Sequence, residues 1–223
     1  MNPLVSVCMP VYNDEKSIRR SIESVLSQTY TNLEVIISDN CSEDNTYLIV
    51  NEFTDSRMII TQNKINLGWQ GNSNQILRRC SGKFVATLHG DDYYLRNDYI
   101  EHVVQTFEEY QEAGILHYVP VDVADKYFFG GGEMVASDYI QHMSSIMYTP
   151  APTVTCFRNQ ALKETNYYDH SYWTTEARLF IEIALKGYST CIVGDDSYFY
   201  RYSGLDKDSQ LVERRIHKLN DLY

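Results

Sequence analysis

The first half of the chain alternates strands with helices, and this alternation constrains the fold more than any other feature of the sequence. Short apolar runs at residues 4–9, 33–38, 58–61 and 84–88 indicate buried strands, and apolar residues at helical spacing follow each of them. Repeated strand–helix units build a parallel sheet whose two faces are covered by helices. We therefore expect an α/β fold, and 223 residues are enough for one such domain.

The second half of the chain is less regular. It contains no internal repeat, and no linker in the sequence is long enough to separate two domains. We expect one domain over 1–223, divided into a half at 1–110 and a half at 111–223. Variable loops are expected over 113–137, helices over 134–146, 176–186 and 208–223, and strands over 153–157 and 191–193.

Charge and hydropathy exclude several kinds of partner. The chain has 19 Lys and Arg against 30 Asp and Glu, a net charge of −11 at pH 7. Neither counterion release nor attraction to anionic lipid favours binding by such a chain, so we expect no nucleic-acid partner. The sequence has no apolar run of the roughly 18–20 residues that a membrane span needs, and no signal-peptide pattern. Together with five cysteines that form no C-x-x-C pair, these features predict a cytoplasmic protein with reduced thiols.

Two carboxylates follow the fourth predicted strand, at the sheet edge where α/β proteins bind ligands. Asp91 and Asp92 repel each other there, and a divalent cation such as Mn²⁺ or Mg²⁺ would offset this repulsion and also hold a diphosphate. The alternative is a solvated Gly-Asp-Asp turn.

Other polar residues at this edge have two interpretations each. Asp39 follows the second strand and either accepts a hydrogen bond from a base or ribose or caps the next helix. Tyr12 either stacks on a planar base or belongs to a simple turn. Glu176 opens a helix after Tyr172 and Trp173, and is either a general base beside a sugar or a carboxylate stabilised by the helix dipole.

The segment at residues 66–74 is rich in asparagine and glycine, which lets its backbone approach a ligand closely. We expect it to be a polar loop, followed by a short helix over 74–79. It lacks the G-x-G-x-x-G spacing of dinucleotide-binding proteins and the pattern of a P-loop. The sequence also lacks the histidine spacings of zinc hydrolases and the G-x-S-x-G motif of serine hydrolases.

The order of these motifs resembles that of the family 2 glycosyltransferases, which have the GT-A fold. The likeness runs from Leu4 to about Tyr202, nearly the whole chain: a strand to P-V-Y-N, a strand to Asp39, N-x-G and N-x-S-N, a strand to D-D, an acidic residue opening a late helix, and Tyr200-Arg201. The resemblance implies a Rossmann-like, mostly parallel central sheet flanked by helices, with a smaller mixed half on the acceptor side. It also implies an inverting transfer of a sugar from a nucleotide-sugar.

The resemblance assigns a role to each candidate residue. Asp39 matches the carboxylate that bonds uracil, which favours a UDP-sugar donor, and Glu176 falls where the family places its catalytic base. Tyr172 and Trp173 are expected to bind the acceptor, a saccharide or lipid-linked saccharide. Asp92 and Asp91 match the metal-binding motif. The residues assigned to nucleotide-sugar binding are Pro10, Tyr12, Asn13, Asp39, Asn66, Gly68, Asn74, Asp91 and Asp92.

Three positions depart from the family pattern. His89 stands where another acidic residue is frequent, Glu176 stands where aspartate is usual, and Ser203 stands where relatives often have histidine. The metal site and the acceptor geometry are therefore expected to differ from those of relatives. The resemblance also leaves room for peripheral association with the inner face of the membrane. Two alternatives remain: a non-catalytic nucleotide-sugar or carbohydrate-binding module, and a sugar nucleotidyltransferase, although residues 10–20 lack the glycine-rich basic loop of the latter.

Overall fold

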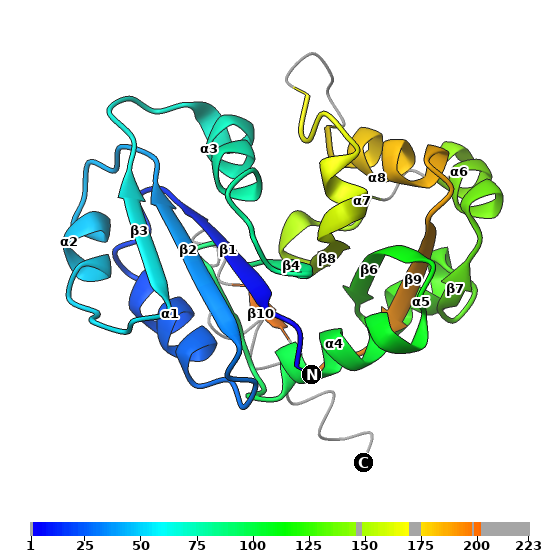
Figure 1. Ribbon diagram of the computed structural model, residues 1–223, viewed down its shortest axis with the longest axis horizontal. Helices are drawn as coiled ribbons and strands as arrows, with labels where there is room; N and C mark the ends of the chain where they lie inside the picture. The colour runs from blue at the N-terminus through cyan, green and yellow to red at the C-terminus, as the bar shows by residue number, and fades with distance from the viewer. Residues whose placement is uncertain (1, 146–148, 170–174, 198, 202–223) are drawn as a thin grey trace.

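A computed structural model describes residues 2–145, 149–169, 175–197 and 199–201 of the chain. Eight strands form one sheet in the order β3-β2-β1-β4-β8-β6-β9-β7, and β5 pairs with β10 in a separate ribbon (Figure 1). Within the large sheet β8 and β7 run antiparallel to their neighbours, and the other pairs are parallel. The expected mostly parallel sheet with a mixed second half is confirmed.

The strands are short and largely apolar. Those of the large sheet are β1 (Val5–Val11), β2 (Leu33–Asp39), β3 (Met58–Gln62), β4 (Phe84–Thr87), β6 (Ala113–Val119), β7 (Gly132–Met134), β8 (Thr155–Arg158) and β9 (Ser189–Gly194), and those of the ribbon are β5 (Asp92–Tyr94) and β10 (Phe199–Arg201).

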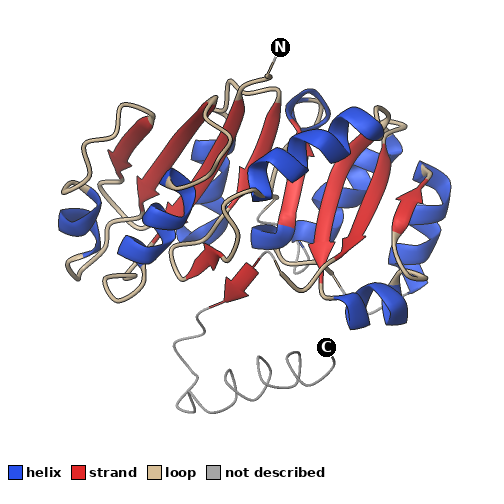
Figure 2. Ribbon diagram, turned by 90° about the horizontal axis from the view of Figure 1, so that it is seen from below, coloured by secondary structure: helices blue, strands red, loops and turns tan. Residues whose placement is uncertain are grey.

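Helices cover both faces of the sheet, as Figure 2 shows. One face packs against α1 (Ile18–Leu26), α2 (Thr46–Val50) and α4 (Tyr99–Glu109). The other packs against α3 (Gly68–Leu77), α6 (Ala136–Ser145), α7 (Asn159–Lys163) and α8 (Thr175–Leu185), while α5 (Val121–Tyr127) lies against β9 and a 3₁₀ turn (Pro152–Val154) precedes β8. The strands are nearly continuous apolar runs because both of their faces are buried. Within the described residues, none of these helices has the length and apolar character to cross a bilayer.

The register of the first three strands brings their carboxyl ends level with one another. Val11 of β1 lies beside Asp39 of β2, and Asp39 lies beside Gln62 of β3. The residues that follow these strands therefore meet along one edge of the sheet. β1 continues through Pro10 rather than ending before it. Proline has no N–H to donate to a neighbouring strand, but the pairing of β1 with β4 has already stopped at Cys8, so proline is tolerated at this position.

Two expectations about the chain are wrong, and one lies outside the described residues. The segment 113–137 is not a set of loops: its first seven residues form β6, which is buried throughout and lies inside the sheet. The helix expected over 74–79 begins earlier, at Gly68, so part of the polar 66–74 segment is helical. The helix expected over 208–223 lies outside the described residues.

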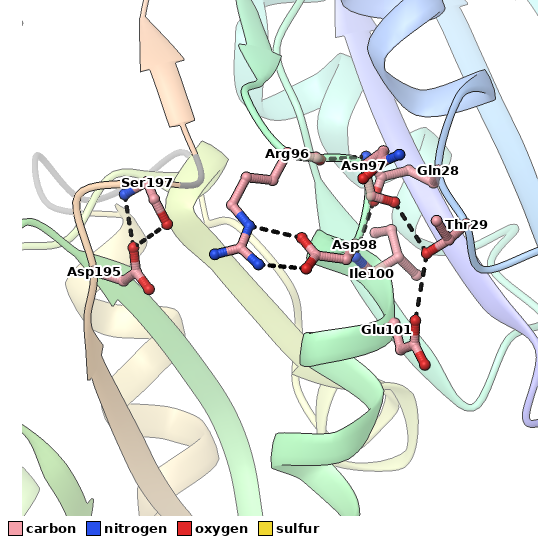
Figure 3. Close-up of polar contacts among 9 residues, drawn as sticks. All are labelled: Gln28, Thr29, Arg96, Asn97, Asp98, Ile100, Glu101, Asp195 and Ser197. Atoms are coloured by element: carbon pink, nitrogen blue, oxygen red, sulfur yellow. Dashed lines mark hydrogen bonds and ion pairs between the residues drawn. The ribbon is translucent and has the colours of Figure 1, made fainter.

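Gln28 fixes the segment between β5 and α4 (Figure 3). Its Nε2 donates a hydrogen bond to the carbonyl of Arg96 at 2.8 Å, and its Oε1 accepts one from the N–H of Ile100 at 3.1 Å. The Nε of Arg96 donates to Asp98 at 2.8 Å. The chain that follows Asp92 is thereby tied to the end of α1.

Candidate active site

A cleft of about 350 Å³ opens at the carboxyl ends of β1, β2 and β4, beside the first turns of α3. This volume is within the range of small-molecule sites, ~300–1,000 Å³. Five of the predicted site residues line it, namely Pro10, Tyr12, Asn66, Gly68 and Asp91. Residues that were not predicted also line it, namely Asp14, Asn40, Trp69, Asn72, Ser73, His89 and Gly90.

The turn after β1 shapes the first wall of the cleft. Tyr12 is 41% exposed there, so its ring is free to contact a ligand. Asn13 adopts a left-handed backbone with φ of 56°, a conformation that asparagine tolerates better than most residues. Its Oδ1 accepts a hydrogen bond from the N–H of Glu43 at 2.8 Å, and its own N–H donates to Ser42 Oγ at 2.9 Å. Asn13 thus shapes the turn, and it does not line the cleft.

Asp39 is fully buried at the end of β2. Its Oδ2 accepts hydrogen bonds from the N–H of Ser42 at 3.1 Å and from Gln62 Nε2 at 3.0 Å. Its Oδ1 has no hydrogen-bond partner among the described residues. A buried carboxylate oxygen is costly to leave unpaired. Asp39 lies at the same edge of the sheet as the cleft, but it is not among the described residues that line it.

A network of asparagines holds the loop before α3 in place. Asn40 Nδ2 donates to Asn66 Oδ1 at 2.9 Å and to the Gly68 carbonyl at 3.2 Å, while its Oδ1 accepts from the N–H of Leu67 at 2.9 Å. Gly68 itself has φ of 72°, which glycine adopts without strain. Asn72 extends the network by donating to the Ser38 carbonyl at 2.9 Å. The asparagine-rich segment 66–74 was the available signal for this network, and it contains Asn72, but the sequence assigned no role to Asn72 or to Asn40.

Acidic residues and a histidine gather at one end of the cleft. Potential metal-binding atoms of His89, Asp91 and Asp92 all lie within 4.8 Å of one another. Two carboxylates and an imidazole are ligands that Mn²⁺ or Mg²⁺ sites accept. His89, a departure from the family pattern in sequence, is therefore part of the candidate metal site.

Asp14 adds a further carboxylate to this end of the cleft. Burial raises its pKa to about 7, a hydrogen bond from the Tyr12 N–H opposes this rise, and the charge of Asp91 adds to it. A Cβ atom built on Gly90 would lie 2.2 Å from Asp14 Oδ2, so only glycine permits this approach. α1 begins four residues after Asp14, and nothing in the sequence distinguished Asp14 from an ordinary turn residue.

The remaining predicted residues lie elsewhere. Glu176 is half-buried in the first turn of α8, where Thr175 Oγ1 donates a hydrogen bond to its Oε2 at 3.2 Å. Asn74 is buried and bonds the backbone of Tyr168 through both of its amide atoms, so it does not line the cleft. Tyr172, Trp173 and Ser203 lie outside the described residues.

Comparison with solved structures identifies the fold. The chain superposes on S. aureus TarS 1–349 in complex with UDP with a TM-score of 0.73, at 23% identity over 88% of this chain and 59% of that one. It superposes equally well, with a TM-score of 0.73, on the mannosyltransferase PcManGT from Pyrobaculum calidifontis in complex with GDP-Man and Mn²⁺, at 18% identity over 96% of this chain and 61% of that one. The expected GT-A fold is confirmed.

Sequence comparison identifies the family. The profile of Glycosyl transferase family 2 matches residues 6–175, and the chain belongs to this family. It is 46% identical over 94 residues to the UDP-Glc:alpha-D-GlcNAc-diphosphoundecaprenol beta-1,3-glucosyltransferase WfgD of Escherichia coli, and 41% identical over 92 residues to the enzyme of the same description, WfaP. These matches cover 42% and 41% of this chain. The chain spans 37% of the length of each relative.

Proposed function

We propose that the protein is an inverting glycosyltransferase that moves a sugar from a UDP-sugar to a hydroxyl of a saccharide or lipid-linked saccharide, in the synthesis of a surface polysaccharide or glycolipid. The observation that carries this proposal is the cluster of His89, Asp91 and Asp92 at one end of a ligand-sized cleft in a family 2 chain. The two halves would serve separate roles, 1–110 for the donor and 111–223 for the acceptor.

Two observations favour UDP as the nucleotide. The buried Oδ1 of Asp39 has no hydrogen-bond partner among the residues that the structure describes, and the N3–H of uracil needs such an acceptor. The relatives WfgD and WfaP are named for UDP-Glc, and TarS has been solved with UDP. Tyr12 and Trp69, both partly exposed in the cleft, offer aromatic faces for the base or the sugar.

The charges in the cleft favour a divalent cation. The described residues that line the cleft include Asp14 and Asp91 but no Lys or Arg. These carboxylates would repel a nucleoside diphosphate. His89, Asp91 and Asp92 would hold the cation, which when bound would stabilise the negative charge of the leaving diphosphate.

Glu176 is the proposed general base. It takes the proton from the acceptor hydroxyl while that oxygen attacks the anomeric carbon, opposite the bond to the diphosphate. The new carbon–oxygen bond forms as the bond to the diphosphate breaks, and this single displacement inverts the anomeric centre. Tyr172 and Trp173 are proposed to bind the acceptor sugar.

A thermal-shift screen of UDP-sugars, with and without Mn²⁺, tests the proposal. A ligand at 100 times its Kd stabilises a protein by about 2.7 kcal/mol, which raises the melting temperature of a chain of this size by ~5–10 °C. We expect such a rise only with both UDP-sugar and Mn²⁺. UDP release from the same sugars then separates an enzyme from a binding module, because a binding module would show the shift but release no UDP.

A further inference from the structure

Three contacts join helix α3, which borders the donor cleft, to the loop between α7 and α8. Asn74 Nδ2 donates to the carbonyl of Tyr168 at 2.8 Å, and the N–H of Tyr168 donates to Asn74 Oδ1 at 2.9 Å. The ring of Trp69 meets that of Tyr168 edge-to-face, with centroids 5.2 Å apart. Arg78, at the end of α3, lies over the ring of Tyr167 at 5.0 Å. One helix thus holds residues that are about 90 positions away in sequence.

The same loop is joined to α8. Asp169 forms an ion pair with Arg178 at 3.2 Å, and both side chains are about one-third exposed or less. Farther along α8, Glu182 accepts a hydrogen bond from the N–H of Asn166 at 3.3 Å. Arg178 is two residues after Glu176, on the same first turns of the helix. A continuous set of contacts therefore leads from α3 to the turn that carries Glu176; α3 and α8 lie on the same side of the sheet (Figure 1).

The surroundings of Tyr168 agree with this arrangement. Its side chain is buried, and burial together with the nearby charge of Glu176 raises the pKa of its hydroxyl. The Glu176 carboxylate therefore acts electrostatically on the residue that Asn74 holds. Tyr168 also borders a small space that is lined by Pro10 and His89, two residues that line the cleft as well.

We propose that Asn74 is a positioning residue for Glu176: it fixes the backbone of Tyr168 and, through the Asp169–Arg178 ion pair, sets the first turn of α8 relative to the donor cleft. This inference rests on the proposed function. It replaces the expected contact between Asn74 and the nucleotide, because both polar atoms of its amide are already bonded to Tyr168. Small displacements of a base relative to the reacting atoms reduce turnover by as much as ~10²-fold without changing ligand affinity.

The test separates donor affinity from turnover. UDP binding in the presence of Mn²⁺ is measured by calorimetry, and turnover is measured as transfer from UDP-glucose to a synthetic GlcNAc-diphospho-lipid, the pair for which two relatives are named. For Asn74→Ala we expect a kcat about 10–100-fold lower, with the Kd for UDP changed less than about twofold because Asn74 does not line the cleft.

Asn159→Ala is the matched control. Asn159 is also a buried amide that bonds backbone carbonyls, those of Cys80 at 3.1 Å and Gly82 at 2.6 Å, but it belongs to no contact between α3 and α8. We expect it to lower the melting temperature as Asn74→Ala does while kcat is retained. An equal loss of kcat in both variants would show that lost stability causes the effect, and it would overturn the inference.

Arg178→Met tests the same connection without altering α3, should Asn74→Ala fail to fold. We expect the same fall in kcat with UDP affinity retained, and recovery of most of the activity in Arg178→Lys. Wild-type kcat in Arg178→Met, or a large loss of UDP affinity with normal kcat in Asn74→Ala, would contradict the positioning role. Absence of transfer by the unmodified protein with every UDP-sugar would instead overturn the proposed function itself.

Discussion

At the scale of single residues, the site is a concentration of negative charge in a protein that is already acidic. Asp14 and Asp91 face a cleft without a lysine or arginine among its described lining residues, and burial holds the pKa of Asp14 near 7. Such an arrangement is unfavourable until positive charge enters it. The net charge of −11, which in the sequence only excluded partners, thus supports a cation in the site.

The metal assignment predicts that Asp92→Ala abolishes binding of a UDP-sugar in the presence of Mn²⁺. Removing one of two carboxylates weakens the cation site, and the diphosphate then meets the remaining negative charge of Asp14 and Asp91. Calorimetry measures the affinity. Asp138→Ala, which removes an exposed aspartate on α6, is the control. Unchanged affinity in Asp92→Ala would refute the assignment.

The proposed base predicts that Glu176→Gln retains donor binding and reduces transfer by roughly 10²–10⁴-fold, the usual contribution of a general base. The amide has nearly the same shape but cannot accept the proton. Glu101→Gln is the matched control, because Glu101 also lies in the first turn of a helix, α4, away from the cleft. Near-normal turnover in Glu176→Gln would remove this residue from the mechanism.

At the scale of elements, the first turns of α3 depend on tertiary contacts rather than on their own sequence. Apart from Trp69 their residues are polar or glycine, and they lack the apolar spacing of an amphipathic helix. The segment is instead held by Asn40, which bonds Asn66, Leu67 and Gly68. Sequence periodicity therefore placed the start of this helix six residues too late.

This dependence predicts that Asn40→Ala lowers both stability and donor affinity. The change removes the acceptor of the Leu67 N–H, and it removes one of the two partners of Asn63 Nδ2 and of Asn66 Oδ1. A polar group left unpaired away from water costs about 1–3 kcal/mol. Urea unfolding and UDP calorimetry measure the two effects. Asn51 is an exposed asparagine just after α2, and its side chain donates one hydrogen bond to the Tyr47 carbonyl. Asn51→Ala should change neither quantity, and equal behaviour of the two variants would argue against the network.

At the scale of the whole molecule, a buried histidine connects the elements of the second half. His117 of β6 bonds Thr155 of β8 through Nδ1 and Tyr139 of α6 through Nε2, each at 2.9 Å, and packs on Phe180 of α8. Burial lowers its pKa from 6.5 to about 3. The folded protein therefore keeps His117 neutral where the unfolded chain would be protonated.

The sign of this shift predicts a loss of stability in mild acid. Above pH 6.5 both states are neutral at His117, and between pH 6.5 and about 3 only the unfolded state gains the proton. This contribution to stability then falls by ~1.4 kcal/mol per pH unit. Urea unfolding should show a lower free energy of unfolding at pH 5 than at pH 7, and this decrease should be smaller in His117→Gln. The difference between the two proteins isolates the contribution of His117, because the other titrating groups are the same in both. Equal losses in the two proteins would exclude His117 as the cause.

Much of the fold followed from local sequence. The four strands of the first half, their helices and the sheet edge with Asp39 and Asp91 were predictable, because apolar periodicity reports which faces are buried. β6 was not predictable in this way. Gly114 and His117 interrupt its apolar run, and both are accommodated only by neighbours from α6, α8 and β8.

The sequence by itself determined the α/β class, the family and most of the residues along the first wall of the cleft, because these depend on periodicity and on motif order along the chain. Only the tertiary structure placed Asp14 and His89 beside Asp91. It also showed that Asn74 bonds the backbone of Tyr168, and that α3 is connected to the turn of α8 that carries Glu176. These contacts join residues up to 94 positions apart. Local patterns carry no information about such pairs, because the free energy of each contact arises only when packing brings both partners out of water together.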